Sequence, residues 1–287
     1  MSRISFEVFP PRTPEGEARL WQTLELLSPL DPSFVSVTCG AGGSATDATF
    51  GVIQGLRARD EELPVAGHLT CVGRTRSETD AEIMRYWHAG VRQIVALRGD
   101  VPGWEGPFEP HPDGYASAVE LITAIRNLAD FEISVAAYPE PHPDSQSVLH
   151  DLHVLAAKAE AGATNAITQF CFDSDAIVKL RDRIKGAGIE LTVVPGILLA
   201  TDFHGLQRMA SRCGAAIPDW LAERFAGLDD DLATRKLVGA IVAAEQVERL
   251  HREGFEDFHF YTLNQGDLAP AVCRLLGSRQ VRERTAA

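Results

Sequence analysis

The sequence predicts a single (β/α)8 barrel, the TIM-barrel fold, over the whole chain of 287 residues. Short apolar runs alternate with longer amphipathic segments from end to end, eight such runs occur, and each is followed by at least one helical pattern. The length fits one domain, because such barrels reach about 250 residues. No Gly/Ser-rich or Pro-rich linker divides the chain, so we expect one domain, 1–287, with a frayed tail at 278–287.

The eight expected strands are short and rich in Val, Ile, Phe or Thr. They are residues 4–9, 34–38, 64–71, 91–97, 131–138, 164–170, 189–195 and 256–262. An α/β barrel needs a helix after each strand, and the intervening segments show that periodicity. The expected helices are 15–28, 45–59, 77–89, 115–128, 146–161, 173–186, 202–213, 218–226, 230–253 and 267–276.

Helix-end signals support these boundaries. Ser77 and Asp173 are the expected N-caps of two helices. The acidic run 229–231 is expected to begin a helix rather than bind a metal, because the helix dipole favours acids at the first turn. The segment 202–253 holds extra helices before the last strand.

Composition and charge exclude several classes of partner. The net charge of −13 argues against nucleic acid and against an anionic membrane surface, although a local positive site could still hold a small anion. No run of about 18 apolar residues predicts a membrane span, and the N-terminus has no signal-peptide pattern. Five scattered cysteines do not suggest a disulfide framework, so a cytoplasmic location fits best.

Glu7 is the most informative single residue. It lies in the first expected strand, between Phe6 and Val8, where a buried carboxylate must be neutral, paired or functional. Burial alone would raise its pKa and make it a proton donor near neutral pH. The alternative is an ordinary ion pair with Arg12.

Polar groups also follow the other expected strands. In an α/β barrel the reactive groups gather at the carboxyl ends of the strands, so we expect these side chains to converge on one rim. The residues at these strand ends are Thr38, Cys39, Ala41, His68, Thr70, Cys71, Arg98, Gly99, Asp100, Tyr138, Glu140, His142, Thr168, Gln169, Tyr261 and Asn264, of which all but Ala41 and Gly99 carry polar groups.

Several familiar motifs are absent from the sequence. There is no GxGxxG fingerprint, no GxxxxGK[ST] loop and no GxSxG elbow, so a dinucleotide would not be bound as in a Rossmann fold. Cys39, Cys71 and Cys171 end three strands, with His68 near them, but no local pair of ligands supports zinc. We expect no metal site.

A set of ordered motifs resembles methylenetetrahydrofolate reductases of the short bacterial type. The matching segments are SFEVFPPR, FVSVT, HLTC, IVALRGD, ISVAAYPEPHP, AGATNAITQF, GLDDDLATRKLVGA and DFHFYTLN, which span nearly the whole chain. The resemblance implies a (β/α)8 flavoprotein that carries FAD. It implies reduction of 5,10-methylenetetrahydrofolate to 5-methyltetrahydrofolate by NADH or NADPH in a ping-pong reaction that supplies methyl groups for methionine synthesis. It also implies a homo-oligomer.

The resemblance assigns roles to individual residues. Glu7 matches the general acid that opens the imidazolidine ring of the folate, and Asp100 matches the acid beside the flavin and pterin. The substrate-binding residues would be Gln169, Tyr261, Met209 and Gln265. The FAD-binding residues would be Thr38, Cys39, Ala41, His68, Arg98, Gly99, Asp100, Tyr115, Ala116, Tyr138, His142, Asp151 and Lys158.

The sequence departs from the family pattern at six positions, one of which is Cys39, where the second strand's TYGA pattern has Tyr. Val154 and Ala157 replace Asn and Arg in the helix that would hold the outer half of the cofactor. Met209 replaces an aromatic residue, Gly205 a Gln and Gln265 an Arg, all on the substrate side. Two alternatives to the FAD-dependent reductase therefore stay open. One is a reductase that binds flavin weakly or not at all, and the other is a non-catalytic protein that binds folate or flavin.

Overall fold

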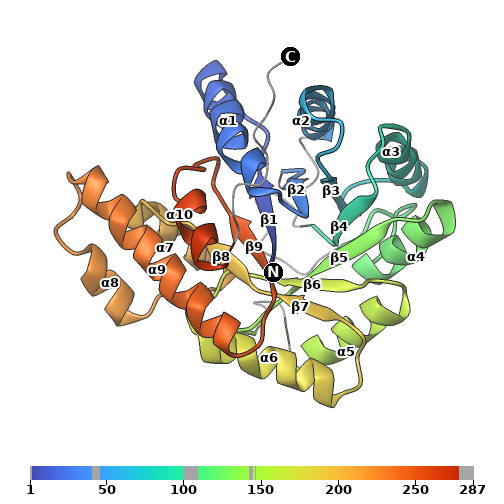
Figure 1. Cartoon of the computed structure of the whole chain (residues 1–287). Coiled ribbons are helices and arrows are strands. Elements are labelled where there is room, and N and C mark those ends of the chain that lie inside the picture. Colours follow the sequence, from blue (N-terminus) through green and yellow to red (C-terminus); the bar gives the residue numbers. More distant parts are fainter. Residues whose placement is uncertain (1, 41–45, 100–108, 142–144, 146, 278–287) are drawn as a thin grey trace.

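A computed structural model of the chain describes residues 2–40, 46–99, 109–141, 145 and 147–277. Its parallel strands form one barrel-like sheet with helices on the outside (Figure 1). The strand order is β7-β6-β5-β4-β3-β2-β1-β9-β8. The strands are β1 (Arg3–Val8), β2 (Phe34–Val37), β3 (Val65–Thr70), β4 (Gln93–Leu97), β5 (Glu132–Ala137), β6 (Asn165–Thr168), β7 (Thr192–Val194), β8 (Gly196–Leu198) and β9 (Asp257–Tyr261). The predicted barrel is confirmed.

The helices follow the strands as expected. They are α1 (Pro14–Leu27), α2 (Thr46–Arg59), α3 (Arg76–His88), α4 (Ala118–Leu128), α5 (Val148–Glu160), α6 (Ser174–Gly186), α7 (Phe203–Cys213), α8 (Asp219–Phe225), α9 (Leu232–Arg252) and α10 (Ala269–Leu275), with a 3-10 turn η1 (Ser28–Leu30). In the described part of the chain, no helix is both long and apolar enough to cross a bilayer.

The seventh strand differs from its prediction. A continuous strand over 189–195 was expected, but the chain forms β7 and β8 on either side of Pro195. β7 pairs with β6 and β8 pairs with β9, so the two pieces together occupy the seventh position. The reason is local: proline has no N–H to donate to a neighbouring strand, although its carbonyl accepts from His259 N at 2.9 Å.

Two helix starts test the cap predictions. Asp173 caps α6 as predicted, accepting from the backbone of Asp175 and Ala176. The prediction for α3 is wrong by two residues: Thr75, not Ser77, is the N-cap, in a capping box with Glu78. Asp231 caps α9, so the acidic run does begin a helix.

Because successive side chains of a strand point to opposite faces, each strand directs one set toward the outer helices and the other into the barrel. Phe6, Phe258 and Phe260 point outward and are fully buried beneath the helices in the main hydrophobic core. A smaller apolar cluster that includes Ala66, Val95, Ile167 and Val194 fills the barrel interior. The inward positions of β1 and β9 are polar instead, and these positions build the site.

The extra helices form a separate layer on one side of the barrel (Figure 1). α7, α8 and α9 contribute to an apolar cluster of their own, with Leu206, Leu221, Phe225 and Val242 among its buried members. Because the residues after β6 and β8 also join that cluster, the layer is fixed beside the carboxyl ends of these strands.

Candidate active site

Glu7 lies near the carboxyl end of β1, inside the barrel. Its neighbour in the register is Tyr261 of β9, while Ser5 pairs with His259. Side chains alternate along a strand, so Ser5 and Glu7 share the inward face, as do His259 and Tyr261. The Glu7 side chain keeps 22% of its surface exposed, so it is enclosed by the barrel but reachable from the mouth.

Two imidazoles face the Glu7 carboxylate. Nε2 of His68 lies 3.3 Å from Glu7 Oε2, and Nε2 of His259 lies 3.8 Å from the same oxygen. The alternative partner Arg12 is not the one observed: among the described residues, these histidines make the ion-pair contacts of Glu7. The carboxylate therefore belongs to a buried acid–base group rather than to a surface ion pair.

His259 is held on three sides. Ser5 Oγ lies 2.8 Å from Nδ1 of His259, and the ring of Phe34 stacks on the imidazole at 5.7 Å. The ring of Tyr261 meets it edge-on at 5.3 Å. Since Nδ1 faces the serine, Nε2 is directed at the Glu7 carboxylate.

The expected direction of the Glu7 pKa shift is wrong. Burial raises the pKa of Glu7, as predicted, but the interactions with the facing imidazoles of His259 and His68 outweigh it. The net pKa lies below the ordinary glutamate value, so the ligand-free site holds a carboxylate at neutral pH. Glu7 therefore contributes stability that is present above the unfolded-state pKa and is lost as the pH falls through the lowered value.

His68 has unused hydrogen-bonding capacity. It is 6% exposed, and its pKa is lowered mainly by burial, so it is neutral near pH 7. Within the described ranges its buried Nε2 has no aligned hydrogen-bond partner. Its backbone is fixed, because the buried Tyr86 hydroxyl donates to the His68 carbonyl at 3.2 Å. A buried nitrogen of this kind is suited to a ligand at the barrel mouth.

The segment after β9 clamps the end of β1. Thr262 Oγ1 donates to the Glu7 carbonyl at 2.7 Å. The Asn264 side chain accepts from Phe9 N at 3.0 Å and donates to Phe9 O at 2.9 Å. Asn264 adopts a left-handed backbone (φ 52°), which asparagine tolerates better than most residues. Asn264, grouped with the rim side chains in the sequence, thus positions the strand that carries Glu7.

Tyr261 and Gln169 are brought to the same interior. The Tyr261 hydroxyl donates a hydrogen bond to the Thr168 carbonyl at 2.8 Å. Burial raises its pKa well above the usual value, so it does not act as an acid near neutral pH. Gln169 follows Thr168 and folds back so that its Oε1 accepts from Phe170 N at 3.0 Å. Gly196 makes room for the ring, because a Cβ there would lie 2.5 Å from Tyr261 Cε2.

Gly99 and two basic residues, Arg98 and Lys158, lie near the ends of β4 and β5. Gly99 has φ 84°, and a Cβ on it would lie 2.5 Å from Val72 Cγ1, so only glycine fits. The Lys158 ammonium donates to Ala136 O at 3.1 Å. Burial, and to a lesser degree the nearby charge of Arg98, lowers the pKa of Lys158 to about 8, although Asp151 opposes this. An anion bound near Lys158 would favour its charged form.

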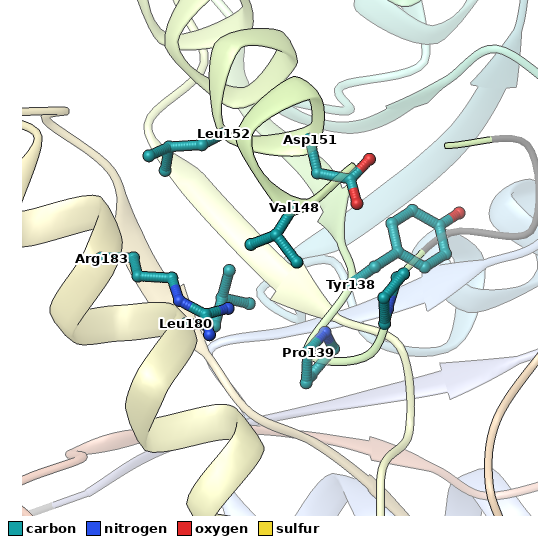
Figure 2. Close-up of a pocket in the computed structure, with 8 residues that line it drawn as sticks. Tyr138, Pro139, Val148, Asp151, Leu152, Leu180 and Arg183 are labelled. Atoms are coloured by element: carbon teal, nitrogen blue, oxygen red, sulfur yellow. The ribbon is translucent and has the colours of Figure 1, made fainter. Parts of the chain in front are cut away.

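A small, shallow hollow lies between α5, α6 and the segment after β5. In Figure 2 the side chains of Tyr138 and Asp151 lie on one side, and Leu180 and Arg183 lie across from them. Two predicted cofactor residues therefore share one cavity, and α6 supplies a wall that the sequence had not indicated.

Tyr115 and Ala116 lie at the start of α4. The Tyr115 hydroxyl donates to Asp80 Oδ1 at 2.6 Å, and its pKa is raised to about 12, mainly by burial. The Ala116 amide donates to Glu120 Oε2 at 3.3 Å. Both have partners within the protein in this structure, and a role in cofactor binding stays a prediction.

The remaining substrate-side and strand-two residues occupy several elements. Met209 is half-buried on α7, at the edge of the cluster that also contacts Tyr261. Gln265 accepts from Thr201 Oγ1 at 2.7 Å. Thr38 and Cys39 follow β2, and burial raises the pKa of the Cys39 thiol. Three predicted site residues, Ala41, Asp100 and His142, lie outside the described residues.

Sequence reasoning missed Ser5 and His259. The signal was present, since Ser5 is two residues before Glu7 and His259 two before Tyr261, and period two places each pair on one strand face. Which residue of the last strand lies opposite which residue of the first strand could not be read from one sequence. Across the described ranges, no group of three or more His, Cys, Asp or Glu side chains could hold a metal ion.

Comparisons with known proteins show the family of the chain. A family model described as methylenetetrahydrofolate reductase matches residues 1–277. The chain is 48% identical to 5,10-methylenetetrahydrofolate reductase of Escherichia coli (strain K12) over 276 residues, which cover 96% of this chain and 91% of that one. It is 32% identical to methylenetetrahydrofolate reductase (NADH) 1 of Arabidopsis thaliana, covering 96% of this chain and 48% of the plant protein.

One solved structure shares the fold. It is described as an uncharacterized protein from Clostridium thermocellum that binds two copies of 5-methyl-5,6,7,8-tetrahydrofolic acid. The TM-score is 0.62 at 16% sequence identity, with 96% of this chain and 93% of that chain covered, so this likeness supports the fold alone. Because the family model spans nearly the whole sequence and a relative is almost half identical, the chain belongs to the methylenetetrahydrofolate reductase family.

Proposed function

We propose that this protein reduces 5,10-methylenetetrahydrofolate to 5-methyltetrahydrofolate with NADH or NADPH, using bound FAD, and so supplies methyl groups for methionine synthesis. The observation that carries the proposal is the Glu7 carboxylate facing two imidazoles beneath the barrel mouth, in a chain of this family. A purely binding protein has no need for an enclosed acid–base group.

The residues near β4 and β5 fit FAD. Arg98 and Lys158 would supply positive charge for a pyrophosphate, and Gly99 lets the backbone beside Arg98 pack closely against Val72 and Thr70. Tyr138 and Asp151 border the hollow, where a carboxylate can accept hydrogen bonds from ribose hydroxyls. When bound, FAD supplies the two-electron chemistry that links oxidation of the nicotinamide to reduction of the folate. These contacts favour a flavin-binding reductase over the flavin-free alternative, despite Val154 and Ala157.

Glu7 supplies the proton for the folate half of the reaction. The substrate would cover the carboxylate, remove its remaining exposure to water and raise its pKa, because desolvation disfavours the charged form. The protonated carboxyl then donates to a ring nitrogen of the folate, which opens the ring to an iminium that accepts hydride. His259, fixed by Ser5, faces the carboxyl and keeps it oriented.

The other residues orient the substrate. Gln169 and Tyr261 lie beside the same interior and would border the pterin, and Asp100 would stabilise a cationic folate intermediate. Met209 and Gln265 would contact the substrate from the side of α7. A homo-oligomer also stays a prediction.

The direct test is product formation. The purified protein, incubated with FAD, NADH and 5,10-methylenetetrahydrofolate without oxygen, should form 5-methyltetrahydrofolate and NAD⁺ in equal amounts, measured by chromatography. Omission of the folate is the control. Oxidation of NADH that yields no methylated folate, with NADPH also inactive, would refute the proposal.

A further inference from the structure

Glu140 connects two parts of the molecule that are far apart in sequence. It follows β5, and its Oε2 accepts a hydrogen bond from the backbone amide of Ala216 at 3.0 Å. Ala216 lies in the turn between α7 and α8, which begins at the left-handed Gly214. A carboxylate that accepts from an amide N–H makes a charge-assisted hydrogen bond, stronger than one between neutral groups.

Two thiols face the same carboxylate. Cys171 follows β6, and its pKa is raised to about 12 by burial and, next, by the charge of Glu140. Cys213 ends α7, and Glu140 also contributes to the raised pKa of that thiol, after burial. Glu140 thus accepts a hydrogen bond from the turn before α8, and its charge acts on thiols that follow β6 and end α7.

The helix that Glu140 reaches forms a wall of the candidate site. α7 carries Met209, which packs in the same apolar cluster as Tyr261. Tyr261 contacts the ring of His259, which faces Glu7. α7 packs in that separate cluster rather than in the main core, through Leu206, Ala210 and Met209, and polar contacts at its two ends join it to other segments.

Different contacts join the two ends of α7 to the rest of the protein. At its start, Asp202 makes no side-chain capping bond to the helix, although Thr201 just before it is bonded to Gln265. At its end, the Ala215 amide bonds back to Ala210 within the helix, whereas the next amide, that of Ala216, bonds to Glu140 across the chain. The Glu140 bond therefore fixes the end of α7 to the segment that also carries Tyr138.

We propose that Glu140 is a positioning residue for the folate, which holds α7 and Met209 against the barrel mouth through the Ala216 amide. It joins the helix on the substrate side to the segment after β5, which borders the candidate cofactor cavity. The expected kinetic effect of this role rests on the proposed function. The attachment itself is a property of the fold and can be tested without turnover.

The test compares Glu140→Ala with Glu140→Gln in the FAD-loaded protein. The alanine variant lacks the acceptor, so the KM for methylenetetrahydrofolate should rise about tenfold while the Kd for FAD stays unchanged. The glutamine variant keeps an acceptor oxygen and should lie near wild type. Exposed Glu190, on the segment before β7, provides the matched control as Glu190→Ala.

A second measurement reports the attachment itself. Limited trypsin digestion should cut after Arg212, at the end of α7, about tenfold faster in Glu140→Ala than in wild type, and near the wild-type rate in Glu140→Gln. If wild type proved inactive, the proposed function would fail while this comparison still tested the attachment. Unchanged cleavage in Glu140→Ala would overturn the proposal. So would a parallel loss of melting temperature, FAD affinity and folate affinity, which would indicate a general structural role.

Discussion

Replacement of Glu7 by glutamine should slow the folate half-reaction by about 10²–10⁴-fold, the usual contribution of a general acid. The amide has nearly the same shape but cannot donate the proton that opens the folate ring. NADH oxidation with an artificial electron acceptor needs no such proton and should stay within about twofold of wild type. Single-turnover absorbance measurements without oxygen separate the two half-reactions.

The pH dependence sharpens this prediction. In wild type the folate half-reaction should slow as the pH rises through the pKa that Glu7 has in the complex, because the protonated form is the donor. The profile of Glu7→Gln should be flat over the same range. Glu25→Gln, on the exposed face of α1, is the matched control. A Glu7→Gln protein with near wild-type folate turnover would show that another group donates the proton.

Replacement of Lys158 by methionine should weaken FAD binding by about 10–100-fold, the range expected for loss of one charge-assisted contact. The ammonium is buried and its pKa is lowered, so a bound pyrophosphate would stabilise its charged form. Fluorescence titration of the FAD-free protein measures the Kd. Lys179→Met, on the exposed side of α6, should bind FAD as wild type does.

This lysine also predicts a pH effect on cofactor retention. Its pKa is lowered to about 8, so in the FAD-free protein it is charged below that pH and loses its charge above it. Wild-type FAD affinity should therefore weaken as the pH rises above about 8, and the Lys158→Met protein should lack this dependence. Equal affinities of the two proteins at pH 7 would remove Lys158 from the cofactor site.

The barrel could be predicted from the sequence because its signals are local. Each strand is a short apolar run, each helix has amphipathic periodicity, and caps such as Asp173 mark helix ends. The prediction of the seventh strand was wrong because the β-propensity of residues 189–195 continues to Pro195. The effect of the N–H that proline lacks depends on which strands pair there, and the sequence does not show this.

The candidate site was predicted in part. Glu7 was found because an acid among large apolar residues is anomalous in any context. Its imidazole partners were not predicted as such: His68 was expected at the site but not beside Glu7, and His259 was missed, because both lie far from Glu7 in the sequence and meet it only through barrel closure. The direction of its pKa shift was wrong for the same reason: burial could be inferred locally, but the opposing partners could not.

The role of Asn264 shows a similar limit. Its place after the last strand suggested a residue on the rim of the site, and the structure shows a side chain that bonds both backbone groups of Phe9. The sequence placed the residue at the correct end of the barrel. Its function there as a clamp depends on the contact between the first and last strands.

The most direct test of the account is the visible spectrum of the FAD-loaded, desalted protein, recorded without oxygen as NADH and then 5,10-methylenetetrahydrofolate are added. We expect a retained flavin band that bleaches with NADH and returns with the folate. No retained band after FAD loading, or a band that NADH bleaches and the folate does not restore, would contradict the proposed FAD-dependent reductase.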